Sequence, residues 1–262
     1  MKLTCIGAGN VAWRLLIAMD KAGHKIEQVI SKSEESAKAL ASKFGAFYGT
    51  DLSKIYDLGD LVLIAVPDDQ IKAVIEALPP ISAVLAHTCG SRGIEVLESK
   101  ALHIGVFYPL QTLNKDIPVD IREVPLLLES SDIQSKITLD NLARSISDKV
   151  QNVTSEERAK YQLAAVVANN FANHLFSLSA DFLEKENLDF NMLIPLIEET
   201  GNKLKSALPS DAQTGPAQRG DLDTLSKHRG MLEDSPELLK WYNAFSSSIL
   251  KKHHKDDTSS DE

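Results

Sequence analysis

The sequence predicts an α/β N-terminal domain, built on a doubly wound parallel sheet and followed by an all-α C-terminal domain. Short apolar runs alternate with helical patterns up to residue 153, which is typical of βαβ units, and from residue 154 onward the pattern is helical alone. The 262 residues, 43% of them hydrophobic, are enough for two cores. We expect domains at residues 1–153 and 154–250 and a disordered polar tail at residues 251–262.

The first domain contains its expected elements in alternating order. We predict strands at residues 2–6, 25–30, 60–66, 83–87, 102–107, 124–129 and 149–153, and helices at residues 11–22, 33–44, 70–77, 94–99 and 133–146. Gly23 is suited to the left-handed residue that ends the first helix, and Ser33 is suited to the N-cap of the second. The apolar run at residues 60–66 is typical of a strand that is buried on both faces.

The second domain opens with a capping box, in which Thr154 precedes Glu157 by three residues. We expect this helix to continue to Leu183, and we expect further helices at residues 191–208 and 236–250. Residues 209–230 are rich in Gly, Pro and Asp, so we expect a long loop with a functional role.

The composition excludes several classes of protein. A formal net charge of −9 leaves no broad basic surface, which argues against a nucleic-acid partner. No apolar run approaches the length of about 18 residues that a membrane span needs, and the first residues lack the pattern of a secretory signal. Cys5 and Cys89 do not make a disulfide framework, so we expect a cytoplasmic protein without a membrane partner. In the tail, His253 and His254 are interpreted as disordered, and no metal site is expected.

A glycine motif lies between the first predicted strand and the first predicted helix, with the sequence Gly7-Ala8-Gly9-Asn10-Val11-Ala12. This is the place of the fingerprint in Rossmann dinucleotide-binding domains. Gly7 permits a tight turn, Gly9 lets the backbone approach a pyrophosphate, and the first amides of the helix attract the anion. We therefore predict that residues 7–11 bind a nicotinamide dinucleotide.

The end of the second predicted strand favours NADP over NAD. NAD enzymes usually have an acidic residue there, whereas this chain has Ser31, Lys32 and Ser33, which suit a 2′-phosphate. The two serines can also cap the following helix, and both roles can hold at once.

Two further segments follow predicted strands, at the edge of the sheet where ligands bind in such folds. Ala65, Val66 and Pro67 are expected to border the cofactor, and Asp68 is interpreted as a helix N-cap. His87 either orients the nicotinamide or the substrate, or forms hydrogen bonds within the sheet end. Cys89 has no evident activating partner, so we do not expect a nucleophile there.

Together with other segments, these motifs resemble a known family. The further segments are Tyr108-Pro109-Leu110-Gln111-Thr112, Asn169-Asn170-Phe171 and the run TGPAQRGD at residues 214–221. The chain resembles the Rossmann-like NADP oxidoreductases with a C-terminal helical domain of unknown function. These are similar in their N-terminal half to pyrroline-5-carboxylate reductase and deazaflavin-dependent NADP reductases. The resemblance implies NADP binding and dimerisation through the helical domain, and it names no substrate. Where it leads us to expect a histidine, this chain has Gln162.

The helical domain contains candidate catalytic residues. β-Hydroxyacid dehydrogenases place a lysine one turn before an asparagine, but here Lys160 precedes Asn169 by more than two turns, which disfavours that chemistry. We expect Asn169, Asn170, Asn173 and His174 to form a buried polar cluster, which either ties helices together or lines a pocket. In a pocket, Asn170 would bind the substrate carbonyl or imine.

The proton donor would then be His174 or His87, because an imidazole has a pKa suited to neutral pH. Arg219 either recognises a substrate carboxylate or pairs with Asp221, and Thr214 and Gly215 are candidates to close over the nicotinamide. Gln111 and Asn169 complete the predicted substrate contacts.

Two functions remain open at this point. The first is an NADP-dependent oxidoreductase that transfers a hydride between NADPH and a small carbonyl or imine substrate. The second is a non-catalytic NADP-binding sensor or scaffold whose helical domain contacts a partner. The wide apolar face of the helix at residues 164–183 favours a homodimer in either case.

Overall fold

The computed structural model describes residues 1–55 and 59–254. The chain divides into two compact units, residues 1–166 and 167–262. All strands found in the described residues belong to the first unit, and the described part of the second unit is helical.

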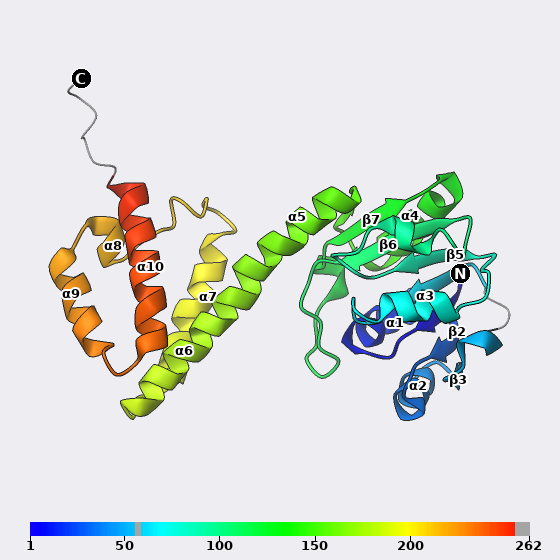
Figure 1. Ribbon diagram of the computed structural model, residues 1–262, viewed down its shortest axis with the longest axis horizontal. Helices are drawn as coiled ribbons and strands as arrows, with labels where there is room; N and C mark the ends of the chain where they lie inside the picture. Colours follow the sequence, from blue (N-terminus) through cyan, green and yellow to red (C-terminus); the bar gives the residue numbers. More distant parts are fainter. Residues whose placement is uncertain (56–58, 255–262) are drawn as a thin grey trace, which may run out of the picture. The chain divides into compact units, whose positions relative to one another are not determined.

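Eight strands form one sheet in the order β3-β2-β1-β4-β5-β6-β7-β8 (Figure 1). In chain order, their bounds are β1 Lys2–Ile6, β2 Lys25–Ile30, β3 Phe47–Gly49, β4 Leu61–Ile64, β5 Val84–His87, β6 Ile104–Pro109, β7 Leu126–Ser130 and β8 Val150–Asn152. All neighbouring strands are parallel except β6 and β7, which are antiparallel. The predicted doubly wound sheet is confirmed. Its order reverses between β1 and β4, and ligands bind at such a switch point.

Helices cover both faces of the sheet because successive strand residues point to opposite sides. On one side, Cys5 and Leu63 pack in a core with α1 (Asn10–Lys21) and α4 (Ile133–Ile146). On the other side, Ile6 and Ile64 pack with α3 (Ile71–Ala77) and the short η2 (Ile94–Leu97). Strand β3 lies at one edge of the sheet, beside α2 (Glu34–Ala41) (Figure 1).

The helix signals in the sequence are confirmed. Gly23, which follows the C-cap residue of α1, has a φ of +86°, and the Ser33 hydroxyl accepts a hydrogen bond from the Ser36 amide at the start of α2. Thr154 and Glu157 form the predicted capping box of α5 (Ser155–Ala165). The helix continues as a π-helical segment, η4 (Val166–Phe171), and then as α6 (Ala172–Lys185).

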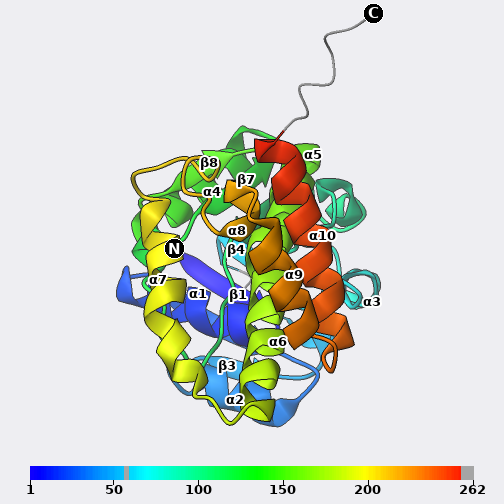
Figure 2. The same ribbon diagram turned by 90° about the vertical axis from the view of Figure 1, so that its left-hand side faces the viewer.

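The second unit departs from the predicted pattern at two places. The expected loop at residues 209–230 contains α8 (Pro216–Arg219) and α9 (Leu222–Met231), because Pro216 and Asp221 begin these two helices. The expected helix at residues 191–208 is shorter, with η5 (Phe190–Leu193) followed by α7 (Ile194–Lys203). The last helix, α10 (Pro236–His253), includes the first residues of the expected tail, and residues 255–262 lie outside the described part. Helix α10 packs against α6, α8 and α9 (Figure 2).

Helix α5 is part of the first unit, whereas the sequence pattern placed a boundary before it. A buried ion pair attaches it: the fully buried Arg158 guanidinium pairs with Glu129 on β7 and donates to the Arg92 carbonyl at 2.5 Å. Glu129 also accepts from the Ser155 hydroxyl at 2.7 Å. The start of α5 is therefore tied to β7 and to the loop after β5.

We expect Arg158→Met to lower the free energy of unfolding by about 3–5 kcal/mol, because it leaves the Glu129 carboxylate largely buried without its cation. Urea unfolding measures this change. Arg122→Ala is the control: it breaks an exposed pair with Asp148 and should cost no more than about 1 kcal/mol. Equal losses in the two variants would contradict the structural role of Arg158.

Candidate functional site

The glycine turn after β1 packs closely against the ends of the neighbouring strands β2 and β4. The Gly7 amide donates to the Ile30 carbonyl at 2.7 Å, and Gly7 has a φ of +115°. A Cβ atom at Gly7 would overlap the carbonyl group of Ala65. Only glycine fits this position, as the motif predicts.

Gly9 has a different role, because a Cβ atom built on it would meet nothing within 4 Å. It is the N-cap residue of α1, and no side chain caps the helix there. No side chain therefore competes for the first amides of α1, and uncapped amides at a helix start can bind a phosphate group.

A cavity of about 310 Å³ lies along this turn. The predicted cofactor residues that line it are Gly7, Ala8, Gly9, Ser31, Lys32, Ala65, Val66 and Pro67. The structure thus brings together three segments that are far apart in the sequence. Thr50 and Leu52, which follow β3, also line the cavity, as do Gln70, the cap residue of α3, and the α3 residues Ala73, Val74 and Ala77. They were missed because β3 was not predicted and because α3 carries no motif.

Three predicted cofactor residues do not line the cavity. The Asn10 side chain accepts from the Lys115 amide at 3.1 Å, Val11 packs against the core, and Ser33 caps α2. The alternative role of Ser33 as a helix cap therefore holds. Ser31 and Lys32 remain at the cavity, and within residues 1–55 and 59–254 no carboxylate forms an ion pair with Lys32.

His87 is fully buried at the end of β5. Its Nδ1 accepts from the Cys89 amide at 3.1 Å, and its Nε2 donates to the Gly93 carbonyl at 3.3 Å. Burial lowers the pKa of His87 to about 4, so the imidazole is neutral at pH 7. Both ring nitrogens thus hold the 87–93 turn, which is the alternative that the sequence left open, and this environment argues against the prediction that His87 donates a proton.

Asp68 is not a helix cap, contrary to expectation. α3 begins at Ile71 with Gln70 as its cap residue, and Asp68 instead accepts a hydrogen bond from the Ser91 hydroxyl. Partial burial opposes ionisation of Asp68, but hydrogen bonds from Cys89 and Ser91 keep its pKa below the usual range. The carboxylate thus links the loop after β4 to the loop after β5.

Cys89 is buried beside this link. Burial raises the pKa of its thiol, and the neighbouring Asp68 carboxylate raises it further. The thiol is protonated at neutral pH, which opposes a nucleophilic role, as expected.

The predicted catalytic residues of the second unit are exposed in this chain. Asn169 and Asn170 lie on the exposed π-helical segment η4, and Asn173 is exposed on α6. The His174 side chain is 54% exposed, with Nε2 3.6 Å from the Glu237 carboxylate. The expectation of a buried cluster is wrong for the single chain, and the π-helical turn also breaks the α-helical spacing on which it rested.

The remaining predicted substrate contacts are described within their own units. Gln111 is exposed and accepts from the Thr112 amide at 2.9 Å, and Arg219 is exposed at the end of α8. Asp221 caps α9 through the Thr224 amide at 3.0 Å, so it serves the local backbone. Thr214 and Gly215 line an apolar cavity of about 270 Å³ within the second unit, together with Trp241.

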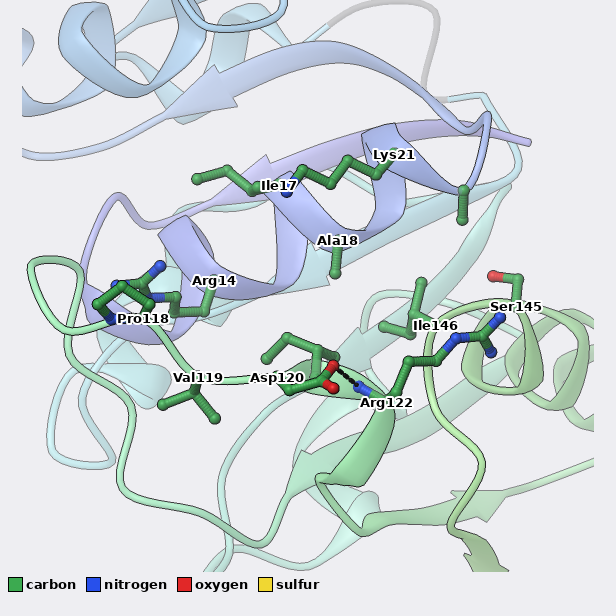
Figure 3. Close-up of a pocket in the computed structure, with 12 residues that line it drawn as sticks. Arg14, Ile17, Ala18, Lys21, Pro118, Val119, Asp120, Arg122, Ser145 and Ile146 are labelled. Atoms are coloured by element: carbon green, nitrogen blue, oxygen red, sulfur yellow. Dashed lines mark hydrogen bonds between the residues drawn. The ribbon is translucent and has the colours of Figure 1, made fainter.

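A larger hollow of about 550 Å³ lies beside α1, the 118–122 segment and the end of α4 (Figure 3). Two of its three cations have protein partners: Arg14 donates to the Asn114 carbonyl at 2.7 Å, and Arg122 pairs with Asp148. We assign no ligand to it.

In the described residues, no group of three or more His, Cys, Asp or Glu side chains is arranged for a metal ion, and no helix is both long and apolar enough to span a membrane.

Comparisons with family models and solved structures find relatives that match most of this chain. A Rossmann-like domain model matches residues 1–108, and the domain of unknown function DUF2520 matches residues 124–249. A Bacteroides fragilis protein named "putative NADP oxidoreductase" is 38% identical, with a TM-score of 0.87, over 95% of this chain and 98% of that one. This chain belongs to the same family as the Bacteroides fragilis protein. The resemblance found in the sequence is confirmed.

More distant structures share the fold. An Aspergillus terreus reductive aminase in complex with NADPH4, cyclohexanone and allyl amine is 14% identical, with a TM-score of 0.72, over 96% of this chain and 94% of that one. A pyrroline-5-carboxylate reductase from Streptococcus pyogenes is also 14% identical, with a TM-score of 0.65, over 96% of this chain and 98% of that one. No protein in a search of curated proteins matches the sequence.

The neutral state of His87 predicts an acid-sensitive fold. Unfolded histidine, with a pKa near 6.5, takes up a proton before the buried imidazole does, so stability is complete above pH 6.5 and is lost as the pH falls toward 4. We expect the free energy of unfolding to fall by about 3 kcal/mol between pH 7 and pH 4 because of His87 alone. Urea unfolding across this range should show a shallower slope for His87→Gln than for the wild type, and equal slopes would contradict the assignment.

Proposed function

We propose that this protein is an NADPH-dependent reductase of a small carbonyl or imine substrate. The observation that carries the proposal is the uncapped start of α1, which opens beside a cavity at the switch point of the sheet. The name of the Bacteroides fragilis relative supports the same class of reaction. The reductive aminase is bound to a ketone and an amine, and the pyrroline-5-carboxylate reductase is named for a compound with a C=N bond, which supports the substrate class.

The preference for NADP over NAD rests on the end of β2. Ser31 and Lys32 line the cavity there, and the Glu34 and Glu35 carboxylates belong to the first turn of α2 and do not line it. A hydroxyl and an ammonium group suit a dianionic 2′-phosphate, whereas NAD sites usually offer a carboxylate to the ribose.

Different parts of the cavity lining have different roles in binding the dinucleotide. The amides at the start of α1 bind the diphosphate, and the Gly7 turn keeps side chains out of its path. Val66 and Pro67 border the cavity at the end of β4 and lead to the Asp68–Ser91 link. NADPH, when bound, supplies the hydride.

We also propose that the second unit binds a second copy of the chain. Many of its large apolar side chains are exposed between residues 171 and 208, namely Phe171, Phe176, Leu188, Met192, Ile194, Leu196, Leu204 and Leu208. An apolar surface of this extent is rare on a monomer, and a two-fold dimer is the commonest way to cover one.

The reductase proposal is tested by cofactor titration and turnover. Gly9→Val should lower NADPH affinity at least 100-fold without unfolding the protein, because the added side chain enters open space where the diphosphate binds. Lys32→Ala should lower NADPH affinity about tenfold and leave NADH affinity unchanged. Fluorescence of NADPH measures binding, and its consumption with keto acids, aldehydes and imines measures turnover.

Gly230→Val is the matched control, since the space around Gly230 is also open and it lies in the second unit. Tight NADPH binding with no consumption on any substrate would favour a sensor or scaffold. Absence of binding to either dinucleotide would overturn both functions.

The dimer proposal predicts that Leu196→Arg with Leu204→Arg yields a monomer in analytical ultracentrifugation, because two charges cannot be buried at the apolar face without partners. Ile133→Arg, at an even more exposed apolar side chain of the first unit, should leave the dimer intact. A wild-type monomer at micromolar concentration would contradict the proposal.

A further inference from the structure

A tyrosine lies at the edge of the sheet where the parallel strands β4, β5 and β6 end. Tyr108 is the penultimate residue of β6, which pairs with β5. A Cβ atom built on Gly90, in the loop after β5, would lie 2.8 Å from Tyr108 Cζ and 2.9 Å from Gln162 Cδ of α5. The phenol ring and the Gln162 carboxamide therefore close over Gly90 from two different elements.

A continuous series of contacts leads from the cofactor cavity to this tyrosine. Pro67 lines the cavity, and the next residue, Asp68, accepts from the Ser91 hydroxyl. Ser91 follows Gly90, which is in contact with the Tyr108 ring. Dinucleotides extend across the strand ends on both sides of the switch point. With one half in the cavity beside β1 and β2, the other half would lie over the ends of β4, β5 and β6.

The Tyr108 hydroxyl is available for chemistry. Tyr108 is half-buried, and none of the described residues forms a hydrogen bond with its hydroxyl. Burial raises the pKa of Tyr108, the negative charge of Asp68 raises it further, and the Arg158 cation opposes this. Cys89 is the other titratable group near the ring, and Arg158 is itself paired with Glu129. The phenol therefore keeps its proton at neutral pH.

The other groups near these strand ends are unsuited to donate a proton. His87 is buried and already neutral, with both ring nitrogens bonded to the backbone. Asp68 has a lowered pKa and is ionised at neutral pH, and Cys89 is buried. Of the described titratable groups near these strand ends, Tyr108 is the one that has both a proton to donate and a hydroxyl without a hydrogen-bond partner.

We propose that Tyr108 is the general acid of the proposed reduction and that Gln162 is a positioning residue that holds the phenol over Gly90. This assignment rests on the proposed reductase function. As the hydride of NADPH forms a bond with the substrate carbon, the π-electron pair of the C=O or C=N bond takes the proton of the Tyr108 hydroxyl. The substrate gains two electrons, NADPH becomes NADP⁺, and the Tyr108 phenolate regains a proton from water before the next turnover.

The test compares Tyr108→Phe with Tyr161→Phe, which removes a hydroxyl from an exposed tyrosine of α5. A general acid contributes about 10²- to 10⁴-fold, so kcat should fall at least 100-fold in Tyr108→Phe. NADPH affinity, measured by fluorescence, should stay within twofold of the wild type in both variants. Ultraviolet titration of tyrosinate should lose a component of raised pKa only in Tyr108→Phe.

A Tyr108→Phe protein with kcat within threefold of the wild type would overturn the assignment and leave the reductase function in place. A wild-type protein that binds NADPH but turns over none of the substrates would overturn the reductase function, and the assignment with it. Gln162→Ala should lower kcat less than Tyr108→Phe does and should lower the pKa of the tyrosine component, because it opens the phenol to water. An unchanged titration in Gln162→Ala would remove Gln162 from the proposal.

Discussion

The structure depends on the close approach of the glycine turn to the ends of β2 and β4. The Gly7 amide bonds to the last carbonyl of β2, while the position of its missing side chain is filled by the Ala65 carbonyl. This contact places α1 at the switch point of the sheet with its first amides uncapped. The cavity exists because the three strand ends meet there with little side-chain volume between them.

Polar contacts connect the loops on the far side of the switch point. Asp68 joins the loop after β4 to the loop after β5, His87 closes the turn that follows it, and Arg158 attaches α5 to β7. The charges in these contacts affect the pKa of neighbouring groups. Burial is the main cause of the low pKa of His87, and the Arg158 cation adds to it, so the imidazole serves as a neutral hydrogen-bonding group. The result is an edge whose loops are held in place by partly or wholly buried side chains.

Side chains that could take part in binding or catalysis occur in both units. The first unit contains the cavity, the linked loops and the half-buried phenol of Tyr108. The second unit contains polar side chains such as His174 and Asn170, which are open to solvent in the single chain beside many exposed apolar ones. A family match extends into both units, so the helical part is a regular component of this architecture.

The sequence by itself determined the elements whose signals are local: the glycine turn, the caps at Ser33 and Thr154, the alternation of strands and helices, and the family. Such features depend on residues within a few positions of one another, so a linear pattern is enough to show them. The short strand β3 escaped prediction because only its pairing with β2 makes it a strand. The roles of His87 and Asp68, and the meeting of Gly90, Tyr108 and Gln162, were decided by the tertiary structure alone. Burial and through-space contacts set the protonation and orientation of these side chains, and neither is encoded in their spacing along the chain.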